Sequence, residues 1–290
     1  MGRHRTFGTV TIAENASVIV GESPPGIGSS RTENQDVRAC GLRVTRSVNV
    51  AKHIGIAAVS PEGSVFCYRE MHRYCHTLIG DTGHPRVTLH NEPFEQYVAA
   101  AMRDDWQTVA DMLRRSARAL AAAGAEFVIT PDNVMQFAVH NAEVGSPIPW
   151  LNMTDLVTSA VVNDQRRCVG LIGTVKVMFG ATYQTLLGLR GIKVMSPTAS
   201  DASEIDGIIF RELVHGTVRA QSRQVMLDAI ARLADRGAEG VILGCSEAPL
   251  LVTAENSPIP VYDAVTLLAE GAVRHSLGMA EPSANVARAG

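Results

Sequence analysis

Two residues capable of acid–base chemistry, Asp132 and Cys245, occupy matching positions in two similar stretches of the chain. The stretches are Gly124-Ala-Glu-Phe-Val-Ile-Thr-Pro-Asp-Asn133 and Gly237-Ala-Glu-Gly-Val-Ile-Leu-Gly-Cys-Ser-Glu247. In each stretch the acid–base residue follows the opening glycine by eight positions, and a short β-branched segment typical of a buried strand lies between them. A carboxylate and a thiol can each take up or release a proton. The spacing therefore predicts an internal repeat whose two halves each supply one acid–base residue.

A second pair of stretches supports the repeat. The segment His53-Ile-Gly-Ile-Ala-Ala-Val59 resembles Cys168-Val-Gly-Leu-Ile-Gly-Thr174, with an offset of 115 residues against 113 for the first pair. Similar offsets in two separate stretches favour two related α/β halves, although generic buried strands also remain an explanation.

Cys245 and Asp132 each have a structural interpretation beside the catalytic one. If Ser246 begins a helix, backbone N–H groups and the helix dipole favour the thiolate of Cys245. A cysteine at this position is otherwise a small buried apolar residue. Asp132 precedes an expected helix, where aspartate commonly serves as an N-cap, and a capping aspartate can also be catalytic.

Polar residues also follow the two strands of the second pair. Ser60 and Ser64 follow the first, and Thr174 and Lys176 follow the second. Hydroxyl and backbone N–H groups at such turns can hold a carboxylate, and a lysine there can neutralise an anionic substrate. Ordinary turn chemistry and a solvated surface lysine are the alternatives. For Glu247 and Asp263, stabilisation of turns is the favoured role.

Composition limits the class of protein. The 290 residues carry a net charge of −3 with 46% hydrophobic and 5% aromatic residues, which is typical of an aliphatic α/β core and argues against a nucleic-acid partner. No apolar run has the length of a membrane-spanning helix, and the N-terminus has no signal-peptide core. The five cysteines show no zinc-ligand or Cys-x-x-Cys spacing, so a reducing cytoplasm is expected, with no metal site.

The pattern of hydrophobic residues predicts alternating strands and helices, and hence parallel sheets with helices on both faces. Strands are predicted at residues 53–59, 86–90, 127–130, 149–153, 168–173, 192–195, 241–243 and 260–262. Helices are predicted from residue 61, with Val65, Met71 and Leu78 on its buried face, and at residues 94–123, 133–141, 155–164, 179–189, 203–213, 219–236 and 264–277. Ligands bind beyond the carboxyl ends of such strands, where Asp132, Cys245, Ser60 and Thr174 lie.

Three regions are expected. Residues 1–50 are turn-rich and are interpreted as a poorly ordered or artefactual extension, with an extra edge hairpin as the alternative. Residues 51–155 together with 260–290 form a first α/β domain, and residues 156–259 form a second. The active site is expected in the cleft between these two pseudosymmetric domains.

Together these motifs resemble the cofactor-independent aspartate/glutamate racemase superfamily, over about residues 53–275. The most specific match is Gly244-Cys245-Ser246-Glu247, which is close to the family's Gly-Cys-Thr-Glu signature. Thr130-Pro131-Asp132-Asn133 is similar to the family's first-cysteine motif, Pro-Cys-Asn-Thr. The resemblance implies two facing acid–base residues and no pyridoxal phosphate or metal. It also implies substrate contacts at Asn133, Val134, Ser246 and Glu247, beside Ser60, Ser64, Thr174 and Lys176.

The chain departs from the family pattern at informative positions. Asp132 replaces the first cysteine, and Lys176 stands where the family tends to have glycine. The family's usual arginine after the second strand has no counterpart in Asn91-Glu-Pro-Phe-Glu95. A buried aspartate can still act as a base if its pKa is raised.

Three functions follow as hypotheses. The first is a racemase or epimerase of an amino acid or similar small carboxylate, using Asp132 and Cys245. The second is a cofactor-free decarboxylase, cis–trans isomerase or lyase that uses Cys245 alone, as in the related arylmalonate decarboxylases, which keep only the second cysteine. The third is an inactive protein that binds a small carboxylate. Neither a nucleic acid nor a membrane is an expected partner, and a homodimer is compatible with the sequence without being established by it.

Overall fold

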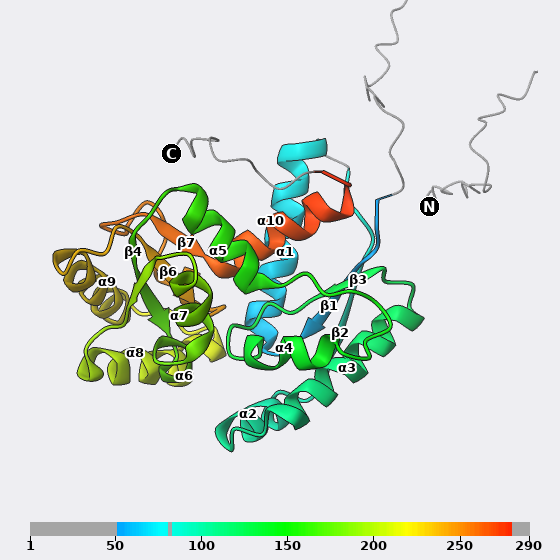
Figure 1. Cartoon of the computed structure of the whole chain (residues 1–290), viewed down its shortest axis with the longest axis horizontal. Helices are drawn as coiled ribbons and strands as arrows, with labels where there is room; N and C mark the ends of the chain where they lie inside the picture. Colours follow the sequence, from blue (N-terminus) through cyan, green and yellow to red (C-terminus); the bar gives the residue numbers. More distant parts are fainter. Residues whose placement is uncertain (1–50, 81–82, 280–290) are drawn as a thin grey trace, which may run out of the picture. The chain divides into compact units, whose positions relative to one another are not determined.

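A computed structural model describes residues 51–80 and 83–279 of the chain. The predicted N-terminal extension and residues 280–290 of the first predicted domain lie outside these described residues. Within them the chain forms two parallel sheets with helices packed around them, which confirms the predicted α/β class (Figure 1).

The first sheet has the strand order β2-β1-β3, and its strands pair in parallel. Its strands are β1 (Ile54–Ala58), β2 (Val87–Asn91) and β3 (Phe127–Ile129). The helices of this half are α1 (Pro61–Ile79), α2 (Phe94–Met102), α3 (Trp106–Ala122) and α4 (Gln136–Glu143). Pro61 occupies the first turn of α1, and the Ser60 side chain caps that helix by accepting a hydrogen bond from Gly63 N.

The second sheet has the order β5-β4-β6-β7 and is also parallel. Its strands are β4 (Cys168–Gly173), β5 (Lys193–Met195), β6 (Val241–Gly244) and β7 (Val261–Asp263). The helices are α5 (Met153–Asn163), α6 (Val175–Met178), α7 (Ala181–Gly188), α8 (Ala199–Arg211), α9 (Ala220–Asp235) and α10 (Ala264–Ser276). Two short 3-10 helices, η1 (Leu213–His215) and η2 (Ala248–Leu250), complete this half.

The two matched Gly-Ala-Glu starts have the same local structure. Gly124 and Gly237 end α3 and α9 with φ of +90° and +99°, a conformation that favours glycine at the end of a helix. Two residues later, Glu126 N donates to His53 O and Glu239 N donates to Cys168 O, each at 2.9 Å. These bonds join β3 to β1 and β6 to β4 at equivalent points, so the repeat read from the sequence is present in the backbone.

Buried residues of the central strands alternate between cores, because successive side chains of a strand point to opposite faces. Ile54, Ile56 and Ala58 join a core that also contains residues of α1, α5 and α10 and of both sheets. Ala57 and Val59 face a second core with α2, α3 and α4, whereas α8 and α9 cover the outer face of the second sheet. The first core therefore unites the two halves.

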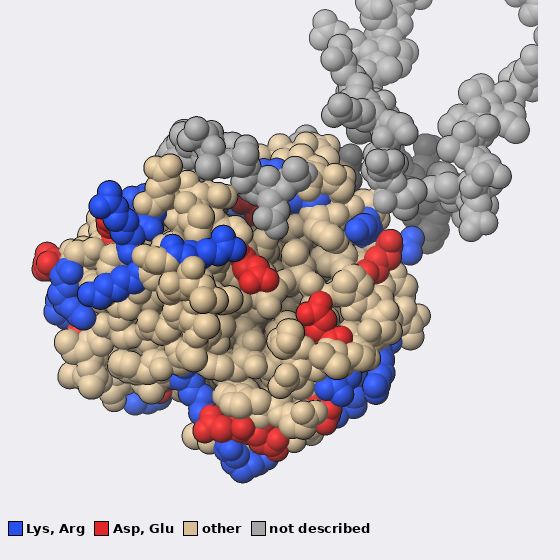
Figure 2. All heavy atoms as spheres, viewed as in Figure 1, with Lys and Arg blue, Asp and Glu red and all other residues tan. Residues whose placement is uncertain are grey.

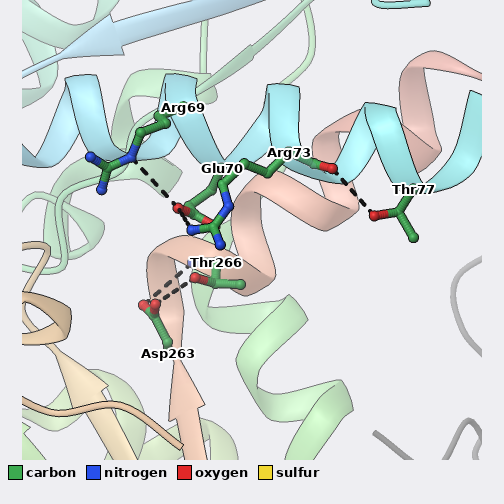
Figure 3. Close-up of polar contacts among 6 residues, drawn as sticks. All are labelled: Arg69, Glu70, Arg73, Thr77, Asp263 and Thr266. Atoms are coloured by element: carbon green, nitrogen blue, oxygen red, sulfur yellow. Dashed lines mark hydrogen bonds and ion pairs between the residues drawn. The ribbon is translucent and has the colours of Figure 1, made fainter. Parts of the chain in front are cut away.

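The start of α10 lies beside α1, and each helix has its own polar contacts there (Figure 3). Asp263 caps α10: its Oδ1 accepts hydrogen bonds from Val265 N at 3.0 Å and Thr266 N at 3.3 Å, and its Oδ2 accepts one from Thr266 Oγ1. On α1, the facing helix, Glu70 forms an ion pair with Arg73, with 3.1 Å between Oε1 and Nη1. Asp263 thus has the structural role that the sequence favoured.

The structure corrects several expected elements. The predicted helix 94–123 is two helices, because Asp104 adopts φ +54° between α2 and α3. The predicted strand 149–153 is a single bridge between Trp150 and Val128. Of the predicted buried face of α1, Val65 is 59% exposed, whereas Met71 is buried as predicted, together with Gly63, Ser64, Cys67 and Cys75.

The segment after residue 259 belongs to both halves. The sequence assigned it to the first domain, but β7 pairs with β6 in the second sheet. The helix that follows, α10, packs against α1 of the first half and against α5. Within residues 51–80 and 83–279, no helix combines the length and hydrophobicity that crossing a membrane requires.

Candidate active site

A cavity of about 360 Å³ lies where the carboxyl ends of strands from both sheets meet. This is the size range of small-molecule sites. The first half contributes Ser60, Asp132, Asn133, Val134 and Met135, with residues of α2. The second half contributes Thr174, Val175, Lys176, Gly244, Cys245, Ser246 and Glu247, with residues of α8 and η1. Both residues of the predicted acid–base pair therefore line one cavity.

Asp132 lies in the turn between β3 and α4. Its Oδ1 accepts a hydrogen bond from Met135 N at 3.1 Å, so the carboxylate holds the turn before α4. The N-cap of α4 is Met135, so Asp132 is not the helix N-cap that the structural interpretation expected. Burial raises the pKa of Asp132 to about 6, and the negative charge of Glu247 acts in the same direction. A carboxyl group with this pKa can act as a base at neutral pH.

Cys245 directly follows β6 and is 5% exposed. Its Sγ donates a hydrogen bond to Glu247 Oε2 at 3.2 Å. Burial, followed by the charge of Glu247, raises the pKa of the thiol well above its usual value. The expectation of thiolate character is therefore wrong, because Ser246 begins no α-helix and the segment after it is the single 3-10 turn η2.

Glu247 lines the cavity and connects the two halves. Its buried carboxylate accepts hydrogen bonds from Ser60 Oγ at 2.5 Å, from Ser246 Oγ at 2.9 Å and from Cys245 Sγ. Gly63 permits this approach, because a Cβ at that position would lie 2.4 Å from Ser246 Cβ. Glu247 was expected to stabilise a turn, but nothing in the linear sequence pairs it with Ser60.

Two polar atoms at the cavity lack a hydrogen-bond partner among the described residues. They are Asn133 Nδ2 and Thr174 Oγ1, and both residues are buried. Tyr183 OH donates to Asn133 Oδ1 at 2.7 Å, which directs the amide and leaves its N–H groups for another partner. Buried polar groups are nearly always paired, so these two atoms are candidates for binding a substrate oxygen.

Lys176 lies on α6 and lines the cavity, but its ammonium group already has a partner. Its Nζ lies 2.7 Å from Asp104 Oδ1 of the first half and 5.8 Å from the centroid of the Trp106 ring. Acidic and basic side chains adjoin along the lower edge of the face in Figure 2, in the region where Figure 1 labels α2. The lysine therefore joins the two halves beside the cavity.

Ser64 is a predicted site residue that lies outside the lining, and two histidines near β2 also lie outside it. Ser64 is buried in the first turn of α1, and the cavity does not reach it. His84 contacts His72 edge to face, and His90 is hydrogen-bonded to Ser116, both away from the cavity. Among the described residues, no group of three or more His, Cys, Asp or Glu is arranged to hold a metal ion.

Sequence reasoning missed the apolar wall of the cavity. Phe94, Val98 and Met102 of α2 and Ile209 and Phe210 of α8 line it. Their spacing on α2 predicts a helix with one apolar face but does not indicate whether that face meets a core or a ligand.

Comparison with known proteins agrees with this architecture. The family model described as Asp/Glu/hydantoin racemase matches residues 56–272. The fold is similar to that of a Yersinia pestis protein provisionally named an Asp/Glu racemase, with 28% identity, a TM-score of 0.71, and coverage of 78% of this chain and 99% of that one. An aspartate racemase homologue from Pyrococcus horikoshii has 22% identity and a TM-score of 0.69 over 78% of this chain and 99% of its own.

A glutamate racemase from Francisella tularensis, solved with D-glutamate, is more distant. It has 15% identity and a TM-score of 0.56, and the match covers 76% of this chain and 79% of that one. The family model covers well over half of the sequence and spans both halves of the repeat. The chain therefore belongs to the Asp/Glu/hydantoin racemase family.

Proposed function

We propose that this chain is a cofactor-independent racemase or epimerase of an amino acid or similar small carboxylate, with Asp132 and Cys245 as its proton-transfer pair. Family membership supports a function of the racemase type. The observation that carries the assignment of the pair is that both side chains line one cavity, each from the end of an equivalent strand.

The two pKa values define the resting protonation state. At neutral pH, Asp132 with its pKa of about 6 is mostly ionised, whereas the raised pKa of Cys245 keeps its thiol protonated. Asp132 then removes the proton from the α-carbon, and the electron pair left behind delocalises into the substrate carboxylate. Cys245 donates its proton to the opposite face and becomes a thiolate, which leaves Asp132 protonated. The reverse reaction begins from that second state.

The intermediate needs stabilisation where negative charge develops, on the substrate carboxylate. Asn133 Nδ2 and Thr174 Oγ1 are buried donors at the cavity with no other partner among the described residues. Donors that are fixed before the reaction stabilise such charge without reorganising. We assign them to this carboxylate, with the turns at Val134 and Ser246 and the charge of Lys176 contributing.

A second candidate is a one-sided reaction, in which Cys245 protonates a planar intermediate after loss of carbon dioxide or during isomerisation. Two observations favour it: the thiol is a buried proton donor, and the Asp132 carboxylate already accepts a hydrogen bond from Met135 N in its own turn. In that reaction Asp132 neither takes up nor releases a proton.

Incubation of enantiopure substrates in deuterated buffer separates the candidates. The racemase is expected to incorporate deuterium at the α-carbon and to lose optical activity at a comparable rate. A one-sided decarboxylase would release carbon dioxide from a malonate and leave amino acids unexchanged. Cys168→Ser is a suitable control, because Cys168 lies at the opposite end of β4 from Thr174 and is not part of the cavity lining.

A further inference from the structure

We infer that the substrate carries one carboxylate and a bulky apolar side chain, and that Val98, Met102 and Phe210 select it. This inference rests on the proposed function, because it concerns the same cavity. The inferred substrate differs from aspartate and glutamate, because both of these amino acids have a second carboxylate on the side chain.

The charges at the cavity oppose a second carboxylate. Four charged side chains line it, namely Asp132, Asp206, Glu247 and Lys176. Among the described lining residues Lys176 is the only cation, and its ammonium group is 2.7 Å from Asp104 Oδ1. A substrate with two carboxylates would place its second charge among three acidic groups, and like charges in a poorly solvated site repel strongly.

The wall formed by α2 is apolar. Phe94, Val98 and Met102 follow one another at four-residue spacing, which places them along one face of the helix. The adjoining face packs into the core through Tyr97 and Ala100, and Phe94 also packs against that core. Val98 and Met102 are therefore not required to complete that core, and Met102 is 75% exposed.

The second half supplies an apolar wall of its own. Ile209 of α8 is buried, whereas Phe210 beside it is 45% exposed, and both line the cavity. Large apolar side chains exposed on two elements around one cavity indicate that a ligand covers them. An aromatic or branched aliphatic side chain would remove this surface from water.

The polar and apolar parts of the cavity therefore suit the two ends of one molecule. The unpartnered donors of Asn133 and Thr174 suit its carboxylate, whereas Val98, Met102 and Phe210 suit its side chain. A positively charged α-amino group would be favoured by the acidic lining. Amino acids such as phenylalanine and leucine, and carboxylates such as 2-phenylpropionate, have this chemistry.

The experiment compares these three probes with aspartate and glutamate on the full chain. Deuterium exchange at the α-carbon measures turnover, and the shift of the melting temperature measures binding. The inference predicts that kcat/KM for exchange is at least about tenfold higher for an apolar probe than for aspartate or glutamate. This is the discrimination that a few apolar contacts provide. Phe210→Ala is expected to raise KM for that probe about tenfold with kcat nearly unchanged.

A substitution that adds a positive charge to the apolar wall tests the specificity further. Val98→Arg adds a cation to the apolar wall and should shift preference toward aspartate or glutamate. Val144→Arg is the matched control, because Val144 is 70% exposed at the end of α4 and does not line the cavity. This control should leave the preference unchanged.

The outcomes distinguish this inference from the proposed function. Exchange that favours aspartate or glutamate overturns the inference and leaves the racemase function standing. Stabilisation by apolar probes without exchange supports the inference and counts against the function. If no apolar probe exchanges or raises the melting temperature, the inference is overturned.

Discussion

Ser60 Oγ donates a hydrogen bond of 2.5 Å to Glu247 Oε1 and so joins the cap of α1 in the first half to the residue two positions after Cys245 in the second. The other oxygen of the same carboxylate, Oε2, accepts a hydrogen bond from the Cys245 thiol. The position of the thiol thus depends on a contact between the two halves.

Removing this contact should destabilise the protein. Ser60→Ala leaves one oxygen of a buried carboxylate without its donor and removes the cap at Gly63 N. The free energy of unfolding is expected to fall by about 2–3 kcal/mol, as for a hydrogen bond to a charged group. Denaturant unfolding measures this. Ser60→Thr keeps a hydroxyl and should lose much less; an equal loss in both variants would show that the hydrogen bond is not the cause.

Asp132→Asn should stabilise the folded protein above pH 6. The pKa of Asp132 rises from 3.8 to about 6 on folding, so wild-type stability falls as the pH rises from about 4 to 6 and the buried carboxyl ionises. Asparagine does not ionise and can still cap the turn. Unfolding at pH 7.5 should show a gain of roughly 1–3 kcal/mol that disappears below about pH 4. A gain of equal size at both pH values would contradict the assignment of this pKa.

Catalysis should depend on pH through the same group. In the direction in which Asp132 removes the proton, kcat/KM is expected to rise with pH and reach half its plateau near pH 6. Because the pKa of Cys245 is raised well above its usual value, the plateau should extend into the alkaline range. A pH–rate profile that falls between pH 6 and 8 would contradict this pair of protonation states.

Cys245 should be alkylated more slowly than Cys168. Its thiol is buried and its pKa is raised, whereas Cys168 is partly exposed. Among Cys67, Cys75, Cys168 and Cys245, iodoacetamide at pH 7 is expected to modify Cys168 first, because thiolate content and access control the rate. Peptide mass spectrometry over time measures the order. Faster labelling of Cys245 than of Cys168 would contradict the raised pKa and support the thiolate of the catalytic interpretation.

Lys176→Met should weaken carboxylate binding by roughly 1–3 kcal/mol, the range for loss of a charged hydrogen bond. Asp104→Asn serves as the matched variant, because it removes the partner of the lysine and keeps the ammonium group. If the lysine acts on the substrate, the first variant binds more weakly and the second binds as well or better. Equal weakening in both would assign Lys176 to holding the two halves together.

The repeat could be predicted from sequence because its signals are local. Gly124 and Gly237 mark helix ends that need a positive φ, and the β-branched segments after them form β3 and β6. The break between α2 and α3 could not be predicted, because Asp104 adopts φ +54° where neither glycine nor proline marks a turn.

The site was only partly predictable, because some of its features depend on contacts between distant parts of the chain. Asp132 and Cys245 stand at strand ends, which the order of elements fixes. The protonation of Cys245 could not be predicted, because burial and the charge of Glu247 oppose the thiolate. The sequence offers a buried cysteine as an alternative, but it does not show that the Glu247 carboxylate accepts a hydrogen bond from the thiol. Ser64 lies in the first turn of α1 and is buried outside the cavity lining, whereas Ser60, the N-cap, lines it; the sequence does not distinguish these two serines.

The most direct test of the central claim measures α-proton exchange and inversion with Asp132→Asn and Cys245→Ser, using whichever substrate the wild type racemises. If the two residues form the proton-transfer pair, each variant loses about 10²–10⁴-fold or more in racemisation, as expected on removing an acid–base group, while Cys168→Ser stays active. Full racemisation by Asp132→Asn beside an inactive Cys245→Ser would contradict the two-base scheme and leave the one-sided reaction of Cys245.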